Sequence, residues 1–88
     1  MKRSSAADVS ATIREFIRCE LMGQPSYNLK EDEPLVSGGL IDSFNLAHIG
    51  AFIEAEFGVA IPPADLDTAH MDTLRLIVAR VMRDWDAG

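Results

Sequence analysis

The segment that most constrains the fold of this chain runs from Gly39 to Pro62. It opens with Gly39-Leu40-Ile41-Asp42-Ser43-Phe44, and Gly58 follows about four helical turns after Asp42. Between these points the apolar positions that recur at helical spacing are Leu46, Ile49, Gly50, Ile53 and Phe57. We therefore predict a helix over residues 43–57, with Asp42 as its N-cap and this face against the core.

Two other stretches have the same periodicity. Residues 8–22 carry a buried stripe at Val9, Ile13, Phe16, Ile17 and Leu21, and glycine and proline follow it. Residues 72–85, with Asp72 as cap, carry Leu74, Ile77, Val78, Val81 and Trp85. A short helix over residues 63–66 opens with proline. With no strand-like alternation and no internal repeat, the sequence predicts an all-α fold, a bundle of three to four helices.

A long connection joins the first two of these helices. Residues 23–42 contain two prolines and the pair Gly38-Gly39. A loop of this length in so small a domain is usually functional or packed by its own side chains. We treat residues 1–88 as a single domain and expect residues 1–7 to be disordered.

Size and charge exclude several classes of function. With 88 residues, the chain has little room for both a core and a deep catalytic cleft. Its net charge of −6 argues against binding nucleic acid or an anionic membrane. The single cysteine, Cys19, cannot form an internal disulfide, and no Cys/His cluster suggests a metal site. With no targeting segment and no membrane-spanning run, we expect a soluble protein of the reducing cytoplasm.

The candidate reactive residues, Asp42 and Ser43, lie at the start of the predicted 43–57 helix. An Asp-Ser pair at a helix start is by itself common, because both residues are favoured there. However, the hydroxyl of Ser43 would lie on an exposed first turn. The free N–H groups and the positive end of the helix dipole would suit a phosphodiester anion at that place.

The segment resembles the acyl carrier protein family. In that family an Asp-Ser-Leu motif carries a phosphopantetheine arm, and the following helix ends in Phe-Gly-(Ile/Val)-x-Ile-Pro; here the corresponding residues are Asp42-Ser43-Phe44 and Phe57-Gly58-Val59-Ala60-Ile61-Pro62. The resemblance implies that Ser43 is the attachment point of a covalent 4'-phosphopantetheine. It also implies that Asp42 caps the helix and helps the transferase bind Mg²⁺ and present Ser43.

Two departures from the family pattern lie near Ser43, and the second of them bears on the branch. Phe44 stands where leucine is usual, and the preceding loop reads Ser37-Gly38-Gly39-Leu40-Ile41 rather than Leu-Gly-Ala. This loop is more similar to those of free-standing aminoacyl and specialised-metabolite carriers, including D-alanyl carriers, than to those of fatty acid synthase carriers. The resemblance implies a monomeric carrier, not an enzyme. Its implied partners are a phosphopantetheinyl transferase, an adenylating ligase or acyltransferase that loads the arm, and an enzyme that unloads it.

The face of the 43–57 helix opposite the core stripe is poor in charge. The residues that we assign to a partner surface there are Phe44, Ala47, His48, Ala51, Glu54 and Ala55, with Asn45 beside them. Two interpretations stay open. These residues are either small helix formers with one tolerated aromatic, or a docking surface for the enzymes that act on the arm.

Two other functions compete with a carrier. Asp42, Ser43 and His48 contain the letters of a hydrolase triad, but five residues separate Ser43 from His48, about 140° around a helix, so their side chains diverge. A plain acidic interaction domain without a prosthetic group would explain the charge and the helices, but not the motif spacing. We predict no catalytic and no metal-binding residue. We interpret His70 as a local loop contact and Cys19 as a partly buried small hydrophobe.

Overall fold

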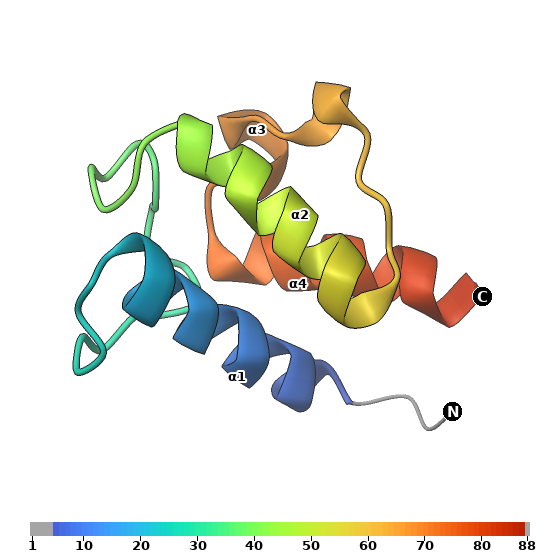
Figure 1. Ribbon diagram of the computed structural model, residues 1–88, viewed down its shortest axis with the longest axis horizontal. Coiled ribbons are helices and arrows are strands. Elements are labelled where there is room, and N and C mark those ends of the chain that lie inside the picture. The colour runs from blue at the N-terminus through green and yellow to red at the C-terminus, as the bar shows by residue number, and fades with distance from the viewer. Residues whose placement is uncertain (1–4, 88) are drawn as a thin grey trace.

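The computed structural model describes the backbone of residues 5–87 and the side chains of residues 5–84. Within that range the chain is helical and contains no strand, so the predicted all-α fold class is confirmed. Its elements are α1 (Ala6–Phe16), the π-helical turn η1 (Ile17–Leu21), α2 (Phe44–Phe57), the 3-10 turn η2 (Pro63–Asp65), α3 (Thr68–Met71) and α4 (Leu74–Ala87). Figure 1 shows their arrangement. No helix in residues 5–87 is both long and apolar enough to cross a membrane.

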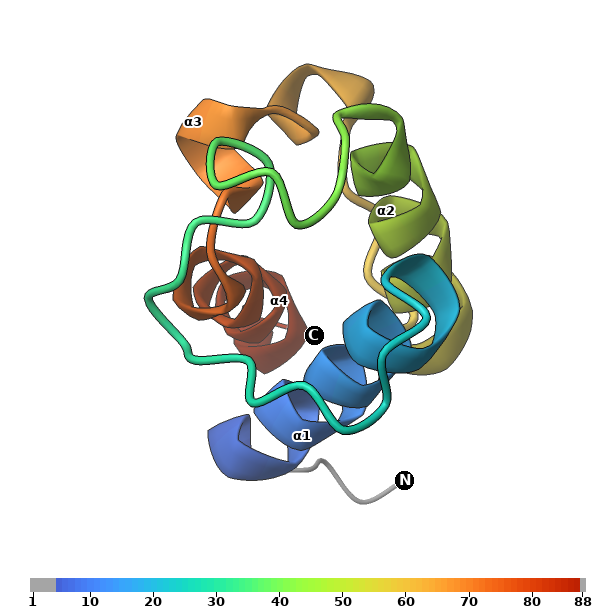
Figure 2. The ribbon, with the colours of Figure 1, turned by 90° about the vertical axis from the view of Figure 1, so that its left-hand side faces the viewer.

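Three long helices enclose one hydrophobic core. In Figure 2, α1, α2 and α4 surround a common centre, and α3 lies above α4 in that view. The buried apolar side chains are Val9, Ile13, Ile17, Leu29, Leu35, Ile41, Leu46, Ile49, Ile53, Val59, Ile61, Met71, Leu74, Ile77 and Val81. The core therefore draws on the helices, on the long loop and on the segment after α2.

The first helix begins earlier than the sequence predicts. The Ser5 hydroxyl accepts a hydrogen bond from the Asp8 N–H at 3.3 Å, and α1 starts at Ala6. Residues 5–7 are thus ordered, contrary to our expectation of disorder over residues 1–7; residues 1–4 lie outside the described part of the chain. The sequence missed this start because Ser5 and the two alanines after it carry no apolar periodicity.

The first helix ends in a widened turn. The Met22 N–H donates to the Ile17 carbonyl at 2.8 Å, and the Gln24 N–H donates to the Arg18 carbonyl at 2.7 Å. Gly23, at φ +66°, takes the left-handed conformation that glycine tolerates best. Cys19, which lies in η1, is exposed, so our interpretation of a partly buried cysteine is wrong.

The long loop between η1 and α2 is anchored in the core. Leu29, Leu35 and Ile41 are buried, so the loop is packed by its own side chains. Four residues of the predicted stripes are only half-buried: Phe16, Leu21, Phe57 and Val78. Phe16 stacks on Phe52, with ring centroids 4.1 Å apart. The side chain of Trp85, the last predicted core residue, lies outside the described side chains.

The segment after α2 contains two short helical pieces where the sequence predicts one over residues 63–66. The turn η2 ends at Asp65, and the separate helix α3 follows, with the Asp67 carboxylate accepting from the His70 N–H at 3.0 Å. Leu66 between them packs against Gly50 of α2, where an added Cβ would come within 3.0 Å of a Leu66 methyl carbon. Glycine therefore allows this segment to approach α2 closely.

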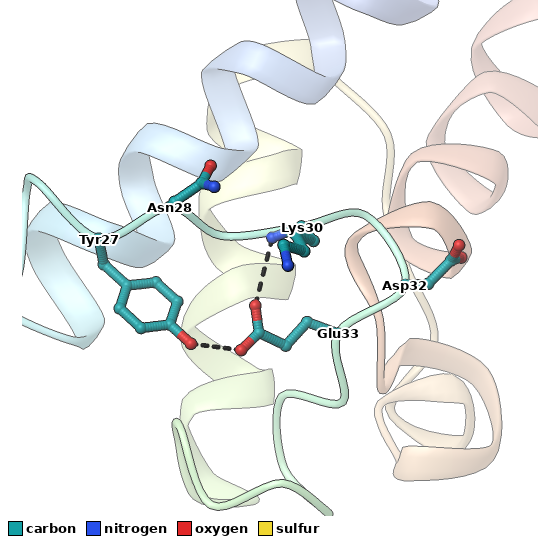
Figure 3. A pocket seen from close by; sticks show the side chains of 5 residues that line it. All are labelled: Tyr27, Asn28, Lys30, Asp32 and Glu33. Atoms are coloured by element: carbon teal, nitrogen blue, oxygen red, sulfur yellow. Dashed lines mark hydrogen bonds between the residues drawn. The ribbon is translucent and has the colours of Figure 1, made fainter.

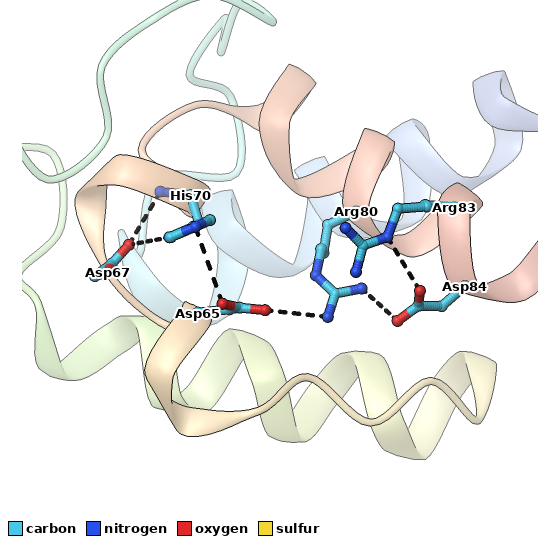
Figure 4. Close-up of polar contacts among 6 residues, drawn as sticks. All are labelled: Asp65, Asp67, His70, Arg80, Arg83 and Asp84. Carbon is cyan, nitrogen blue, oxygen red and sulfur yellow. Dashed lines mark hydrogen bonds and ion pairs between the residues drawn. The ribbon is translucent and has the colours of Figure 1, made fainter.

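An ion pair between Asp65 and Arg80 joins the same segment to α4, as Figure 4 shows. The Arg80 guanidinium, largely buried, binds Asp65 at 3.2 Å and also pairs with Asp84. Histidine 70 lies in α3 rather than in a loop, and its Nδ1 lies 2.7 Å from the Asp67 carboxylate. This hydrogen bond raises the pKa of His70 and lowers the pKa of Asp67.

The start of α4 differs from the prediction. The helix begins at Leu74, and the cap is the Thr73 hydroxyl, which accepts from the Leu76 N–H at 3.1 Å. The Asp72 carboxylate instead accepts from the N–H groups of Val36 at 2.8 Å and Ser37 at 3.1 Å. Partial burial acts to raise the pKa of Asp72, but the hydrogen bonds from the loop outweigh it and lower the pKa. Asp72, which we predicted as the cap of this helix, therefore binds the long loop instead.

Candidate functional site

The start of α2 is held by a reciprocal pair of hydrogen bonds. The Asp42 carboxylate accepts from the Asn45 N–H, and the Asn45 side-chain oxygen accepts from the Asp42 N–H, both at 3.1 Å. This is the geometry of a capping box, with asparagine in the place of the usual Glu or Gln. Asp42 thus caps the first turn through its side chain, while α2 itself begins at Phe44, one residue later than predicted.

Ser43 lies between this cap and the helix. It is exposed, its backbone is already helical at φ −67° and ψ −23°, and its hydroxyl makes no capping hydrogen bond. In the described part of the chain, the N–H groups of Ser43 and Phe44 donate no hydrogen bond either. An exposed hydroxyl therefore stands beside unused backbone donors at the positive end of a helix of 14 residues.

The approach to Ser43 is a tight turn that needs both glycines of the loop. The Leu35 carbonyl accepts from the Leu40 N–H at 2.8 Å and from the Ile41 N–H at 3.1 Å. Gly39 has φ +80°, and a Cβ on Gly38 would lie 2.3 Å from the Pro34 carbonyl oxygen. Larger residues cannot follow this path without strain. Buried Ile41 then brings the chain directly to Asp42 and the helix.

All six residues that we assign to a partner surface are exposed in the structure: Phe44, Ala47, His48, Ala51, Glu54 and Ala55. We call this set the outer face of α2. Phe44 is 81% exposed, the largest value among the large apolar side chains described. Asn45 does not belong to this surface, because it is half-buried and engaged with Asp42. Glu54 is the single acidic residue of the outer face.

The acidic loop residues lie on another part of the surface, drawn in Figure 3. They border a hollow of about 580 Å³ that Tyr27, Asn28, Lys30, Asp32 and Glu33 line. The Arg75 guanidinium donates to Asp32 at 2.6 Å and lies 3.5 Å from Glu31, and this hydrogen bond lowers the pKa of Asp32. A hydrogen bond from Tyr27 likewise lowers the pKa of Glu33. Much of the negative charge here is already paired.

The structure does not assemble a hydrolase triad. Ser43 and His48 are both exposed, and no hydrogen bond joins their side chains. No group of three or more metal-ligating side chains gathers among the residues described. The residues at the start of α2 offer an exposed hydroxyl beside unused backbone N–H groups, a combination that suits an anion at this place.

Comparison with known proteins agrees with this geometry. A search of curated proteins found no match to the sequence. A family model described as a phosphopantetheine attachment site matches residues 8–81, from α1 into α4, and its domains are carriers rather than enzymes. Because this match covers most of the chain and includes the start of α2, the protein belongs to the family of phosphopantetheine-bearing carrier domains.

Proposed function

We propose that Ser43 is the residue to which the phosphopantetheine arm is attached. The supporting observation is its exposed hydroxyl, which makes no capping hydrogen bond and lies beside the N–H groups of Ser43 and Phe44. By contrast, the Ser37 hydroxyl in the preceding loop is bound to Asp72. Both serines are exposed, but of the two only Ser43 has a hydroxyl that is not engaged by a carboxylate.

The chain's own contribution is presentation and charge stabilisation. Asp42 and Asn45 fix the backbone of the first turn, so the exposed Ser43 side chain is presented from a held position. When the serine oxygen loses its proton and displaces adenosine 3',5'-bisphosphate from the pyrophosphate of coenzyme A, the new phosphodiester anion would lie at the positive end of α2. The attached group would supply a thiol that holds the cargo as a thioester, so Cys19 need not take part in carriage.

We further propose that partner enzymes dock on the outer face of α2. This face begins beside Ser43, carries the most exposed large apolar residue described and has little charge. Burial of Phe44 and of the alanine methyl groups would supply the binding energy. The partners are a phosphopantetheinyl transferase, a loading ligase or acyltransferase, and an unloading enzyme.

We also infer a wider role from the resemblance of the loop to those of known carriers. The Ser37-Gly38-Gly39-Leu40-Ile41 sequence resembles free-standing aminoacyl and specialised-metabolite carriers. We therefore propose a free-standing, monomeric, cytoplasmic carrier of acyl or aminoacyl intermediates in specialised metabolism, such as polyketide or nonribosomal peptide synthesis. Its cargo would be kept near each active site at high effective concentration, because the arm confines it.

An intact-mass measurement tests the attachment site. The protein is incubated with coenzyme A, Mg²⁺ and a broad-specificity phosphopantetheinyl transferase, in parallel with Ser43→Ala. We expect the wild type to gain the mass of one phosphopantetheinyl group and the alanine variant to gain none while keeping its helical circular dichroism. An alanine variant that gains the same mass would show that another residue is modified.

A wild type that stays unmodified under these conditions would instead favour the competing function, an unmodified acidic interaction domain. That domain would use the same outer face of α2 for binding, but no enzyme would need to reach Ser43. The two outcomes therefore separate a wrong residue from a wrong function.

A further inference from the structure

Asp72 makes a set of contacts that the carriage of an arm does not by itself explain. It lies between α3 and α4, and its carboxylate accepts from the Val36 N–H, the Ser37 N–H and the Ser37 hydroxyl. Its own carbonyl accepts from the Leu35 N–H at 2.7 Å. One residue of the second half of the chain therefore fixes three consecutive residues of the long loop.

These contacts pass directly to the backbone in front of Ser43. Leu35, held by Asp72 through its N–H, accepts from the Leu40 and Ile41 N–H groups through its carbonyl. Leu35 and Ile41 are also buried, so the turn is fixed both by hydrogen bonds and by the core. Two residues after Ile41 comes Ser43. Figure 2 shows the loop passing beside α3 before it enters α2.

A second contact from the same region holds the loop further upstream. The Arg75 N–H donates to the Glu31 carbonyl at 3.0 Å, and its side chain binds Asp32. Asp72 and Arg75, near the start of α4, therefore bind the loop at two places. Thr73 does the capping of α4, which leaves the Asp72 carboxylate to the loop alone.

We propose that Asp72 is a positioning residue for the modification of Ser43, acting through the 35–41 turn. The proposal rests on Ser43 being the attachment site. With Asp72 in place, the turn is ordered before the transferase arrives, and docking does not have to order it. Without it, docking of the transferase has to order the turn, and this cost raises the KM for the carrier rather than lowering kcat.

The test compares variants of Asp72 with a matched aspartate. Asp72→Ala removes the acceptor, Asp72→Asn keeps one oxygen for the loop N–H groups, and Ser37→Ala removes one bond. Asp84→Ala is the control, because Asp84 is also half-buried and bonded but contacts Arg80 and Arg83 instead of the loop. Each variant is followed by thermal unfolding, by amide hydrogen exchange at Leu40 and Ile41, and by transferase kinetics with coenzyme A.

For Asp72→Ala we expect faster exchange at both amides and a KM for the carrier raised about tenfold, with kcat within about twofold of the wild type. Asp72→Asn should recover most of the KM. Ser37→Ala should raise the KM by a smaller factor of about two. If Asp72→Ala does not fold, Ser37→Ala still tests the positioning role. Asp84→Ala should leave the KM unchanged.

Three results would overturn the proposal. One is a wild-type KM in Asp72→Ala, or in Ser37→Ala when the former does not fold. Another is a rise in KM for Asp84→Ala equal to that for Asp72→Ala, since the effect would then be general destabilisation. The third is a wild-type protein that takes up no arm, and in that case the proposed function fails as well. By contrast, if Asp72→Ala speeds amide exchange but leaves the transferase kinetics unchanged, the positioning role alone is contradicted.

Discussion

The two faces of α2 are both apolar, but only one of them is used by the fold. Leu46, Ile49 and Ile53 are completely buried, and Gly50 lets Leu66 pack closely. On the other side, the outer face exposes Phe44 together with small residues. A helix with a single task would bury one face and cover the other with charge. The comparison shows that packing in the core explains the inner face but not the outer one, which is the face that we propose for docking.

The largest effect should come from breaking the inner face. Ile53→Ala removes a buried branched side chain and should lower the free energy of unfolding by about 2–5 kcal/mol. Ala51→Ser, on the outer face, should change it by about 0.5 kcal/mol or less. Both are measured by urea denaturation. Equal midpoints for the two variants would contradict the assignment of the faces.

The outer face should respond in binding rather than in stability. Phe44→Ala and Ala51→Glu should each raise the KM of the loading enzyme for the modified carrier by about fivefold or more, which corresponds to a contact of about 1 kcal/mol. Their unfolding midpoints should stay near that of the wild type, because both positions are exposed. A normal KM in both variants would remove the outer face from the docking surface.

A smaller response is expected to salt. Exposed charge pairs contribute about 0–1 kcal/mol each and are screened, and Glu54 is the single acidic residue of the outer face. The KM of the loading enzyme should therefore change by less than about threefold between low and high salt. Arg75→Ala, which frees the carboxylates of Glu31 and Asp32, should leave it unchanged. A steep salt dependence that this variant alters would assign recognition to the acidic loop.

The smallest effect concerns the segment that covers Gly50. The pKa of His70 is raised by its bond to Asp67, so the protonated form stabilises the folded state at low pH. This contribution is complete below the unfolded-state pKa of His, about 6.5, and is lost as the pH rises through the folded-state pKa. The melting temperature of the wild type should therefore fall slightly more than that of His70→Gln between about pH 6 and pH 9. Parallel curves would show that the pair contributes nothing.

The sequence predicts well what depends on near neighbours. The periodicity identified the buried residues Leu46, Ile49 and Ile53, and the Asp42 cap acts over three residues. It predicts poorly what depends on distant partners. Asp72 carries the same local signal for a helix cap as Asp42, yet its partners Val36 and Ser37 are 36 and 35 residues away.

Other differences have similar causes. Thr73 caps α4, while the Asp72 carboxylate binds the loop. The periodicity of the sequence does not indicate which of these two neighbouring residues is the cap. Met71 is fully buried in a helix of four residues, too short for any periodic pattern to form. Cys19 is exposed because it lies about 200° around the helix from the buried Ile17, whereas our expectation of partial burial rested on the residue type alone.

The central claim is that the start of α2 presents Ser43, rather than Ser37, for modification. Trypsin leaves both serines in one peptide between Lys30 and Arg75, so the modified protein must be mapped by fragment ions that separate residue 37 from residue 43. The account predicts the added mass in fragments that contain Ser43 and its absence from those that contain Ser37 without Ser43. Added mass on the Ser37 fragments, with Ser43 unmodified, would contradict it.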